Sequence, residues 1–200
     1  MSQAVISVGA YVLGSQVSVS LSRSNDGAGQ WSPSVAAGKA GSLTTRTDND
    51  TGVATLSTGH GIVTSDKVDV FWAGGRRYGM TATVATNAVT IDGGAGDNLP
   101  TQGTAVVVCK RVEVNAAFDP DDMLALLVTA NKRASVVFVD SVDAVLFALD
   151  LAAGECCMWW SDSGITRPFT GNAVAKIVVG NGDSDAALAV TVAALYDATP

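Results

Sequence analysis

Residues that favour strands and turns greatly outnumber those that favour exposed helices in this sequence. The 200 residues include 28 valines, 18 threonines and 21 glycines, but only two glutamates and five lysines. Valine and threonine suit pleated strands and glycine suits tight turns, whereas glutamate and lysine are common on helix surfaces. The sequence therefore predicts an all-β protein. Catalytic side chains are also scarce, since His60 is the single histidine.

Charge is scarce and is carried mostly by aspartate. Only 16% of the residues are charged and 48% are apolar, so we expect an oligomer that buries much of its surface against copies of itself. Aspartate accounts for 17 of the 19 acidic residues, and it favours turns and caps. The 12 lysines and arginines are scattered, which predicts no nucleic-acid partner. The pair Arg76–Arg77 is interpreted as a solvated flank of a hairpin.

The sequence gives no sign of membrane insertion or export. No apolar stretch is long enough for a membrane-spanning helix, and the first residues lack the basic region of a signal peptide. Cys109, Cys156 and Cys157 do not form a disulfide framework and fit a reducing compartment. We therefore expect synthesis in a cytoplasm and no membrane partner.

The pattern of residue types changes along the chain. Residues 4–22 read as one long or two short strands, because valine and leucine alternate with serine in the second half. Residues 30–42 are small and irregular and are interpreted as a loop or linker. Residues 43–111 hold five short strand candidates separated by glycine-rich turns, which is the size of a small barrel. Residues 112–200 form a second strand series.

The N-terminal strands are too short to fold alone, so we expect them to pair with the C-terminal series. The predicted fold is a jelly-roll-like sandwich made of residues 1–42 plus 112–200, with a small β-barrel inserted as residues 43–111. The alternative is a serial order of two domains, with a boundary near Lys110 to Glu113.

Two local structures are open at the start of the C-terminal series. Asp119 followed by Pro120 is a candidate cap for a short helix that reaches about Leu127. The competing interpretation, which we favour, is a loop that feeds a strand from Leu124 to Ala130.

The candidate reactive groups have simpler structural explanations. His60 lies in a glycine-flanked turn, where a positive φ angle would account for it. A hydrolase would need His60 beside an acid and a nucleophile, and no nucleophile motif accompanies it. Cys156 and Cys157 lie in an apolar run and are expected to be core thiols. The sequence therefore predicts a protein that is not an enzyme.

Two oxygen-rich turns are candidate calcium sites. The segments 48–52 and 181–185 resemble the start of a calcium loop, but the later glutamate of an EF-hand is missing. A solvated turn is the preferred interpretation, and no metal or other cofactor is predicted. The candidate ligands are Asp48, Asp50, Asp183 and Asp185.

Tryptophans are the clearest candidates for recognition. Trp159 and Trp160 are neighbours, so they point to opposite faces if they lie in a strand. Two buried rings are the preferred interpretation, and an exposed ring would mark a contact with a glycan or a protein. Trp72 with Tyr78 is a second candidate platform for a sugar.

Two passages resemble structural proteins of tailed-bacteriophage and prophage virions. They are Leu43 to Val106, with the phrases GHGI and GGAGDNLP, and Asn172 to Pro200, with VVGNG and LYD. The resemblance covers about half of the chain and includes no catalytic signature. It implies a virion component present in many copies, such as a capsid decoration, head-fibre, tail or baseplate protein.

The leading prediction is therefore a non-enzymatic virion protein, made in the host cytoplasm, whose partners are copies of itself and other virion proteins. Its alternative is a carbohydrate-binding sandwich module, with a glycan as the partner. The residues expected to anchor the interface are Trp31, Trp159, Trp160 and Phe169.

Overall fold

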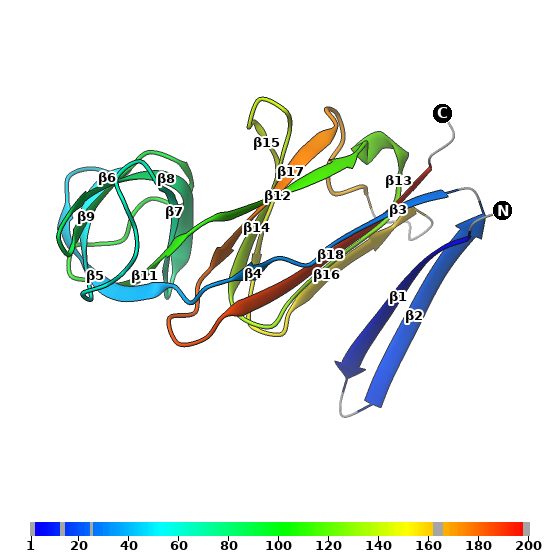
Figure 1. Cartoon of the computed structure of the whole chain (residues 1–200), viewed down its shortest axis with the longest axis horizontal. Coiled ribbons are helices and arrows are strands. Elements are labelled where there is room, and N and C mark those ends of the chain that lie inside the picture. The colour runs from blue at the N-terminus through cyan, green and yellow to red at the C-terminus, as the bar shows by residue number, and fades with distance from the viewer. Residues whose placement is uncertain (1–2, 13–14, 25, 162–165, 198–200) are drawn as a thin grey trace.

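The computed structural model describes residues 3–12, 15–24, 26–161 and 166–197. In this part of the chain almost every regular element is a strand, and Pro120–Asp122 form a single 3-10 turn. Figure 1 shows a small barrel at one end, a sandwich in the middle and a two-stranded hairpin at the other end. The all-β prediction, with a barrel inserted into a sandwich, is confirmed.

The barrel closes completely. Its sheet runs in the order β10-β8-β7-β11-β5-β6-β9, and an additional pairing of β8 with β9 joins the two sides into a six-stranded barrel. The expected barrel range was residues 43–111, and the strands that form it begin at Lys39 and end at Lys110. The strands are β5 (Lys39–Arg46), β6 (Thr51–Leu56), β7 (Lys67–Trp72), β8 (Gly75–Ala85), β9 (Ala88–Asp92), β10 (Ala95–Gly96) and β11 (Ala105–Lys110).

The sandwich consists of two antiparallel sheets. One has the order β12-β17-β14-β15, and the other has the order β16-β13-β18-β3, with β4 also paired to β18. The first sheet contains β12 (Val112–Phe118), β14 (Ala134–Val139), β15 (Val145–Leu151) and β17 (Val174–Asn181). The second contains β3 (Asp26–Trp31), β4 (Ser34–Val35), β13 (Met123–Ala130), β16 (Cys156–Trp160) and β18 (Leu188–Asp197).

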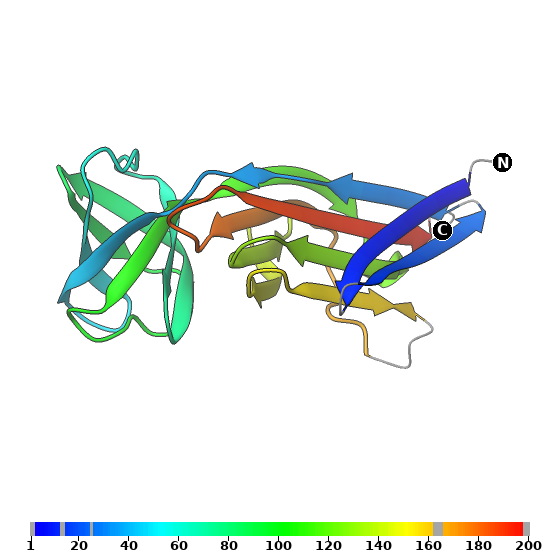
Figure 2. The same cartoon turned by 90° about the horizontal axis from the view of Figure 1, so that it is seen from below.

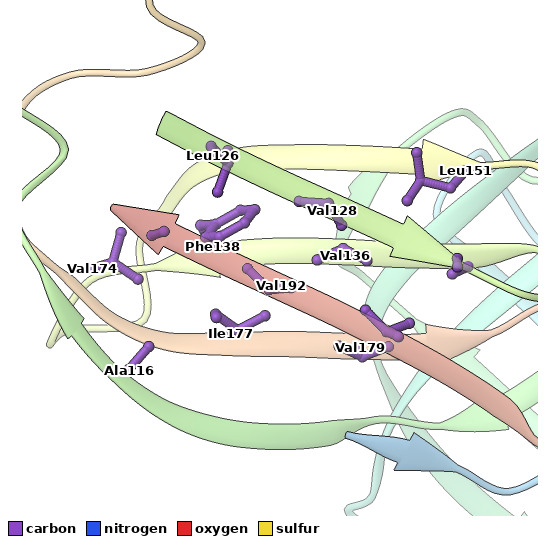
Figure 3. Close-up of a cluster of buried hydrophobic side chains, with 14 of the residues drawn as sticks. Ala116, Leu126, Val128, Val136, Phe138, Leu151, Val174, Ile177, Val179 and Val192 are labelled. Atoms are coloured by element: carbon purple, nitrogen blue, oxygen red, sulfur yellow. The ribbon is translucent and has the colours of Figure 1, made fainter. Parts of the chain in front are cut away.

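Alternating residues of both sheets meet in one apolar core. Figure 3 shows Leu126, Val128 and Val192 of one sheet gathered with Phe138 and Ile177 of the other. Every residue of β14 is buried, because the inner face of this strand packs in the sandwich core and its outer face packs under the barrel. A strand covered on both faces has no polar alternation.

The N-terminal segment differs from its prediction. Residues 4–22 were expected to pair with strands of the sandwich, but β1 (Gln3–Val12) and β2 (Ser15–Ser24) pair with each other. The register matches Val8 with Val19, and the short connection makes this local pairing easy to form. In Figures 1 and 2 the hairpin lies at the end of the sandwich that is far from the barrel.

The residues that join the sandwich from the N-terminal side come later in the chain than expected. β3 pairs with β18 along its whole length, and β4 pairs with β18 further on. Part of the segment 30–42, which was interpreted as a loop, is therefore strand. Small side chains hid this signal, because Gly27 and Gly29 of β3 lie under the rings of Tyr196 and Trp31.

The turn at Asp119 resolves the choice between helix and strand. Pro120–Asp122 form one 3-10 turn, and an oxygen of the Asp119 side chain accepts a hydrogen bond from the Asp121 N–H at 2.8 Å. β13 then starts at Met123, so the helix to Leu127 does not form. The favoured prediction of a loop that feeds a strand is confirmed.

Candidate interaction surface

The strand β16 presents an apolar patch at an edge of the five-stranded sheet. Its side chains alternate, with Cys157 and Trp159 turned toward the core and Cys156, Met158 and Trp160 turned outward. Trp159 is 5% exposed, whereas Trp160 is 36% and Met158 is 38% exposed. We call Cys156, Met158 and Trp160 the β16 patch. The opposite orientation of the two tryptophans follows from the period of two in a strand, but the preferred interpretation of two buried rings is wrong.

The patch continues into an apolar face of the same sheet. Across the strands, Trp160 is paired with Ala125 and then Leu195, and Met158 is paired with Leu127 and then Ala193. These four neighbours are buried and form an apolar cluster of their own on the outer face. Met158 and Trp160 are therefore the exposed margin of an apolar sheet face whose other members are already buried, and their direct cross-strand neighbours carry no charge.

The other three predicted anchors are part of the core. Phe169 is 7% exposed, and its ring lies 5.2 Å from that of Phe147, centroid to centroid. Trp31 is partly buried 5.6 Å from the Phe118 ring. The ring of Trp159 packs under the guanidinium of Arg167 at 5.8 Å. These three side chains stabilise the sandwich itself, and Trp160 is the most exposed of the four predicted anchors.

Met158 is the residue of this surface that the sequence analysis missed. Its signal was available, since residues two apart in a strand share a face and Met158 stands two residues before Trp160. The alternation of a strand, and not the adjacency of the two tryptophans, places a methionine and a tryptophan on one face.

In two of the calcium candidates, Asp48 and Asp183, a carboxylate oxygen accepts hydrogen bonds from the main chain of its own turn. Asp48 Oδ1 accepts hydrogen bonds from the N–H groups of Asp50 and Thr51, both at 2.7 Å. Asp183 Oδ1 accepts from those of Asp185 and Ala186, at 2.8 and 2.9 Å. These backbone donors hold the pKa of Asp48 and of Asp183 below the usual carboxyl range.

The other two calcium candidates, Asp50 and Asp185, are not part of a cluster of metal-binding side chains among the described residues. Asp50 forms an ion pair with Arg77. In the described part of the chain, no group of three or more histidine, cysteine or acidic side chains lies close enough together to hold a metal ion. The two loops are well explained as turns stabilised by side-chain hydrogen bonds.

His60 stabilises a turn between strands. Its Nε2 lies 2.9 Å from the carbonyl oxygen of Thr86, and its Nδ1 accepts a hydrogen bond from the Ile62 N–H at 3.1 Å. Both ring nitrogens of His60 therefore have main-chain partners. The expected positive φ angle falls on Gly59 and Gly61 instead of on His60.

The cysteines are free thiols in three different environments. Cys109 is buried, and its Sγ accepts a hydrogen bond from the Asn181 N–H at 3.1 Å. Burial also raises the pKa of the Cys157 thiol, which is partly buried beside the core. Cys156 is exposed in the β16 patch, so the prediction that it is a core thiol is wrong.

A buried polar cluster joins the barrel to the sandwich. Asp69 of β7 is 1% exposed, and its carboxylate accepts hydrogen bonds from the Ser135 hydroxyl at 2.5 Å and the Gly79 N–H at 2.9 Å. Arg111 Nε lies 3.2 Å from the same carboxylate. A Cβ atom at Gly180 would clash with Asp69 Oδ2, so the two domains approach closely only because residue 180 is glycine.

The surroundings of Arg76 and Arg77 correct their interpretation as a solvated flank of a hairpin. The two side chains are 13% and 8% exposed and are not solvated. Arg76 pairs with Asp150 of the sandwich, and Arg77 donates to the carbonyl oxygens of Gly94, Gly96 and Asp97. A sequence pattern does not reveal this burial, because the acceptors come from distant segments of the chain.

Comparison with known proteins found no similar protein or family. The sequence matches no protein-family model, and no curated protein or solved structure matches it either. Within the described residues, none of the helical structure has the length and apolar character needed to span a membrane.

Proposed function

We propose that this protein is a non-enzymatic structural component of a tailed-bacteriophage type of virion, and that it acts by joining surfaces. The observation that carries the proposal is the exposed β16 patch at the margin of an apolar sheet face. The resemblance of residues 43–106 and 172–200 to virion proteins points the same way. Its partners would be copies of itself and other virion proteins, in a particle assembled from chains made in the host cytoplasm.

The composition of the patch favours a protein partner. Methionine and tryptophan are enriched at protein interfaces, and charged residues are depleted from interface centres. A single exposed tryptophan surrounded by aliphatic neighbours offers a large contact area at a small loss of side-chain entropy. The hydrogen bonds and the ion pair between barrel and sandwich would hold this surface in a fixed direction relative to the barrel.

The test is a charge at the centre of the patch. Trp160→Asp should abolish assembly, measured as native mass over a wide concentration range and as incorporation into particles. It should leave the unfolding temperature nearly unchanged, because Trp160 lies outside the core. Val63→Asp is the matched control, since Val63 is 57% exposed on the barrel and carries no part of the proposed surface.

The result that contradicts the proposal is a Trp160→Asp protein that assembles like the wild type. Equal loss in both variants would also contradict it, because the effect would then follow from added charge and not from the site.

The alternative, a carbohydrate-binding module, rests on a hollow beside Trp72. Its volume is about 340 Å³, and Phe71 and Arg133 also line it. Sugar binding depends on free hydrogen-bonding groups around an aromatic ring. Arg133 already donates to the carbonyl oxygens of Trp72 and Gly75 and to Asp150, so the hollow offers less than the β16 patch. Saturable glycan binding that Trp72→Ala removes would favour this alternative.

A further inference from the structure

We infer that β16 pairs with β16 of a second copy of this chain, in antiparallel orientation, to form one continuous sheet across a two-fold dimer. The inference rests on the proposed function, because it names the partner of the same patch. It follows from the edges of the sandwich, from the direction of the main-chain groups of β16 and from the register that the strand allows.

The first argument compares the edges of the sandwich. An edge strand exposes unpaired main-chain groups, and proteins usually protect it with charges, bulges, prolines or a covering segment. β12 carries Glu113 and has an irregular register between Asn115 and Phe118. β15 carries Asp150, which is covered by Arg76 and Arg133.

The edge at β3 is protected in another way. β1 lies beside β3, and β12 also approaches it. By contrast, β16 has the sequence CCMWW, without a charge, a proline or a bulge. Among the strands that the structure describes, none pairs with its outer side. β16 is therefore the edge strand of the sandwich that lacks these protections and could pair with another strand.

The second argument concerns the direction of the main-chain groups. The N–H of Ala130 donates to the carbonyl of Glu155 on the β16 side, and the N–H of Asn131 donates to Ala189 on the β18 side. Main-chain groups alternate in direction along a strand, so the even-numbered residues of β13 point toward β16. Since Val128 is paired with Cys157, the inward-bonding residues of β16 are Cys157 and Trp159.

The main-chain groups of the three patch residues therefore point to the open edge. The same three residues carry the exposed side chains, so one event would satisfy the main chain and cover the apolar patch. A partner strand meets both needs at these three residues in a single contact.

The third argument is the register. A two-fold axis at Met158 is the arrangement that pairs all five residues of β16, with Cys156 opposite Trp160 of the second copy and Met158 opposite its own equivalent. It keeps outward side chains on one face and inward side chains on the other, as strand pairing requires. Because β16 itself carries no charged residue, no like charges meet along the five paired residues. A neutral strand whose pairing is self-complementary fits the isologous contact of a two-fold dimer.

The direct test is a cysteine at the axis. In a background of Cys156→Ser and Cys157→Ala, Met158→Cys should form a disulfide-linked dimer under mild oxidation, because opposed residues in such a pair have Cα atoms about 5.5 Å apart. Val63→Cys in the same background is the matched control and should form no disulfide-linked dimer. A Met158→Cys protein that forms no more covalent dimer than the control would overturn the inference.

A second pair of variants separates strand pairing from contact between side chains. Met158→Pro removes an N–H that points to the open edge and no hydrogen bond to β13. It should raise the dimer dissociation constant about tenfold, since two symmetric hydrogen bonds are lost. Met158→Leu keeps the N–H and should bind within about twofold of the wild type. Equal affinities of the two variants would contradict strand pairing.

The failure of this inference can be told apart from failure of the proposed function. A chain that stays monomeric at every concentration, yet loses incorporation into particles in Trp160→Asp, would show that the patch binds a different virion protein. Incorporation that survives in Trp160→Asp would remove the proposed function as well.

Discussion

The barrel and the sandwich both bury an apolar core, but they end their sheets in different ways. The barrel joins β8 to β9 and leaves no open strand on its six-stranded path. The sandwich has four outer strands, of which β12, β15 and β3 are protected and β16 is not. The closed region has little means to add a strand, whereas the open region offers both free main-chain groups and an apolar patch. This difference places the proposed interface on the sandwich.

The joint between the two regions buries polar groups of both. Ser135 and Asp69 are both almost fully buried at this boundary, and Arg133 of the sandwich donates to the carbonyl oxygen of Trp72 in the barrel at 2.6 Å. Separation of the two regions would break the hydrogen bonds from Ser135 to Asp69 and from Arg133 to Trp72, and would require these groups to be solvated instead. We therefore expect the two regions to behave as one cooperative unit.

The largest expected effect comes from creating a cavity in either core. Phe138→Ala should lower the free energy of unfolding by about 3–5 kcal/mol, and Leu43→Ala by about 2–5 kcal/mol. Both side chains are fully buried, Phe138 in the sandwich and Leu43 in the barrel. If the joint couples the regions, each variant should show a single urea transition at a lower midpoint. Two separate transitions would break the comparison by showing that the barrel and the sandwich unfold independently.

A smaller effect tests the joint through pH. Burial raises the pKa of Asp69 in spite of the nearby Arg111, so the folded protein keeps a proton that the unfolded chain has already released. The free energy of unfolding should therefore fall as pH rises from the ordinary carboxyl pKa through the raised one, by at most about 1.4 kcal/mol per pH unit. Asp69→Asn has no such proton and should lack this part of the slope.

The measurement is the urea midpoint of both proteins over a series of pH values. The difference between them should move in favour of Asp69→Asn as pH rises. Parallel curves would mean that Asp69 titrates alike in the folded and unfolded chains, and that its burial at the joint does not govern its charge.

The smallest effect concerns the turn at Asp48 in the barrel. Asp48→Ala should lower the unfolding temperature only slightly, because it removes the acceptor of two backbone N–H groups at a fully exposed site. Calcium and a chelator should each leave the unfolding temperature of the wild type unchanged. A rise with calcium that Asp48→Ala removes would instead show that this turn is a metal site, and would give the barrel a ligand of its own.

Part of this structure could be predicted from residue types and local patterns. The excess of valine and threonine indicated strands, because branched side chains suit a pleated surface. Asp119 followed by Pro120 indicated a turn, since the cap and the fixed φ angle act within a few residues. The opposite orientation of Trp159 and Trp160 followed from the geometry of any strand.

Other features depended on segments far apart in the sequence. Val8 meets Val19 instead of a strand of the sandwich, and Arg76 finds Asp150 across the joint. Burial of Asp69 needs a glycine at position 180, which no pattern around residue 69 reveals. These outcomes are decided by which surfaces meet, and pairing energies of neighbouring alternatives are too similar for local patterns to choose between them.

The sequence by itself determined that this protein is built from strands, that its turns are held by glycine and aspartate, and that its two neighbouring tryptophans face apart. Those properties follow from the steric preferences of each residue and its nearest neighbours. Only the tertiary structure decided that Trp159 is covered and Trp160 is not, and that β16 lies at an unprotected edge. The reason is physical, because exposure depends on which other strands arrive beside a residue, and those strands come from everywhere in the chain.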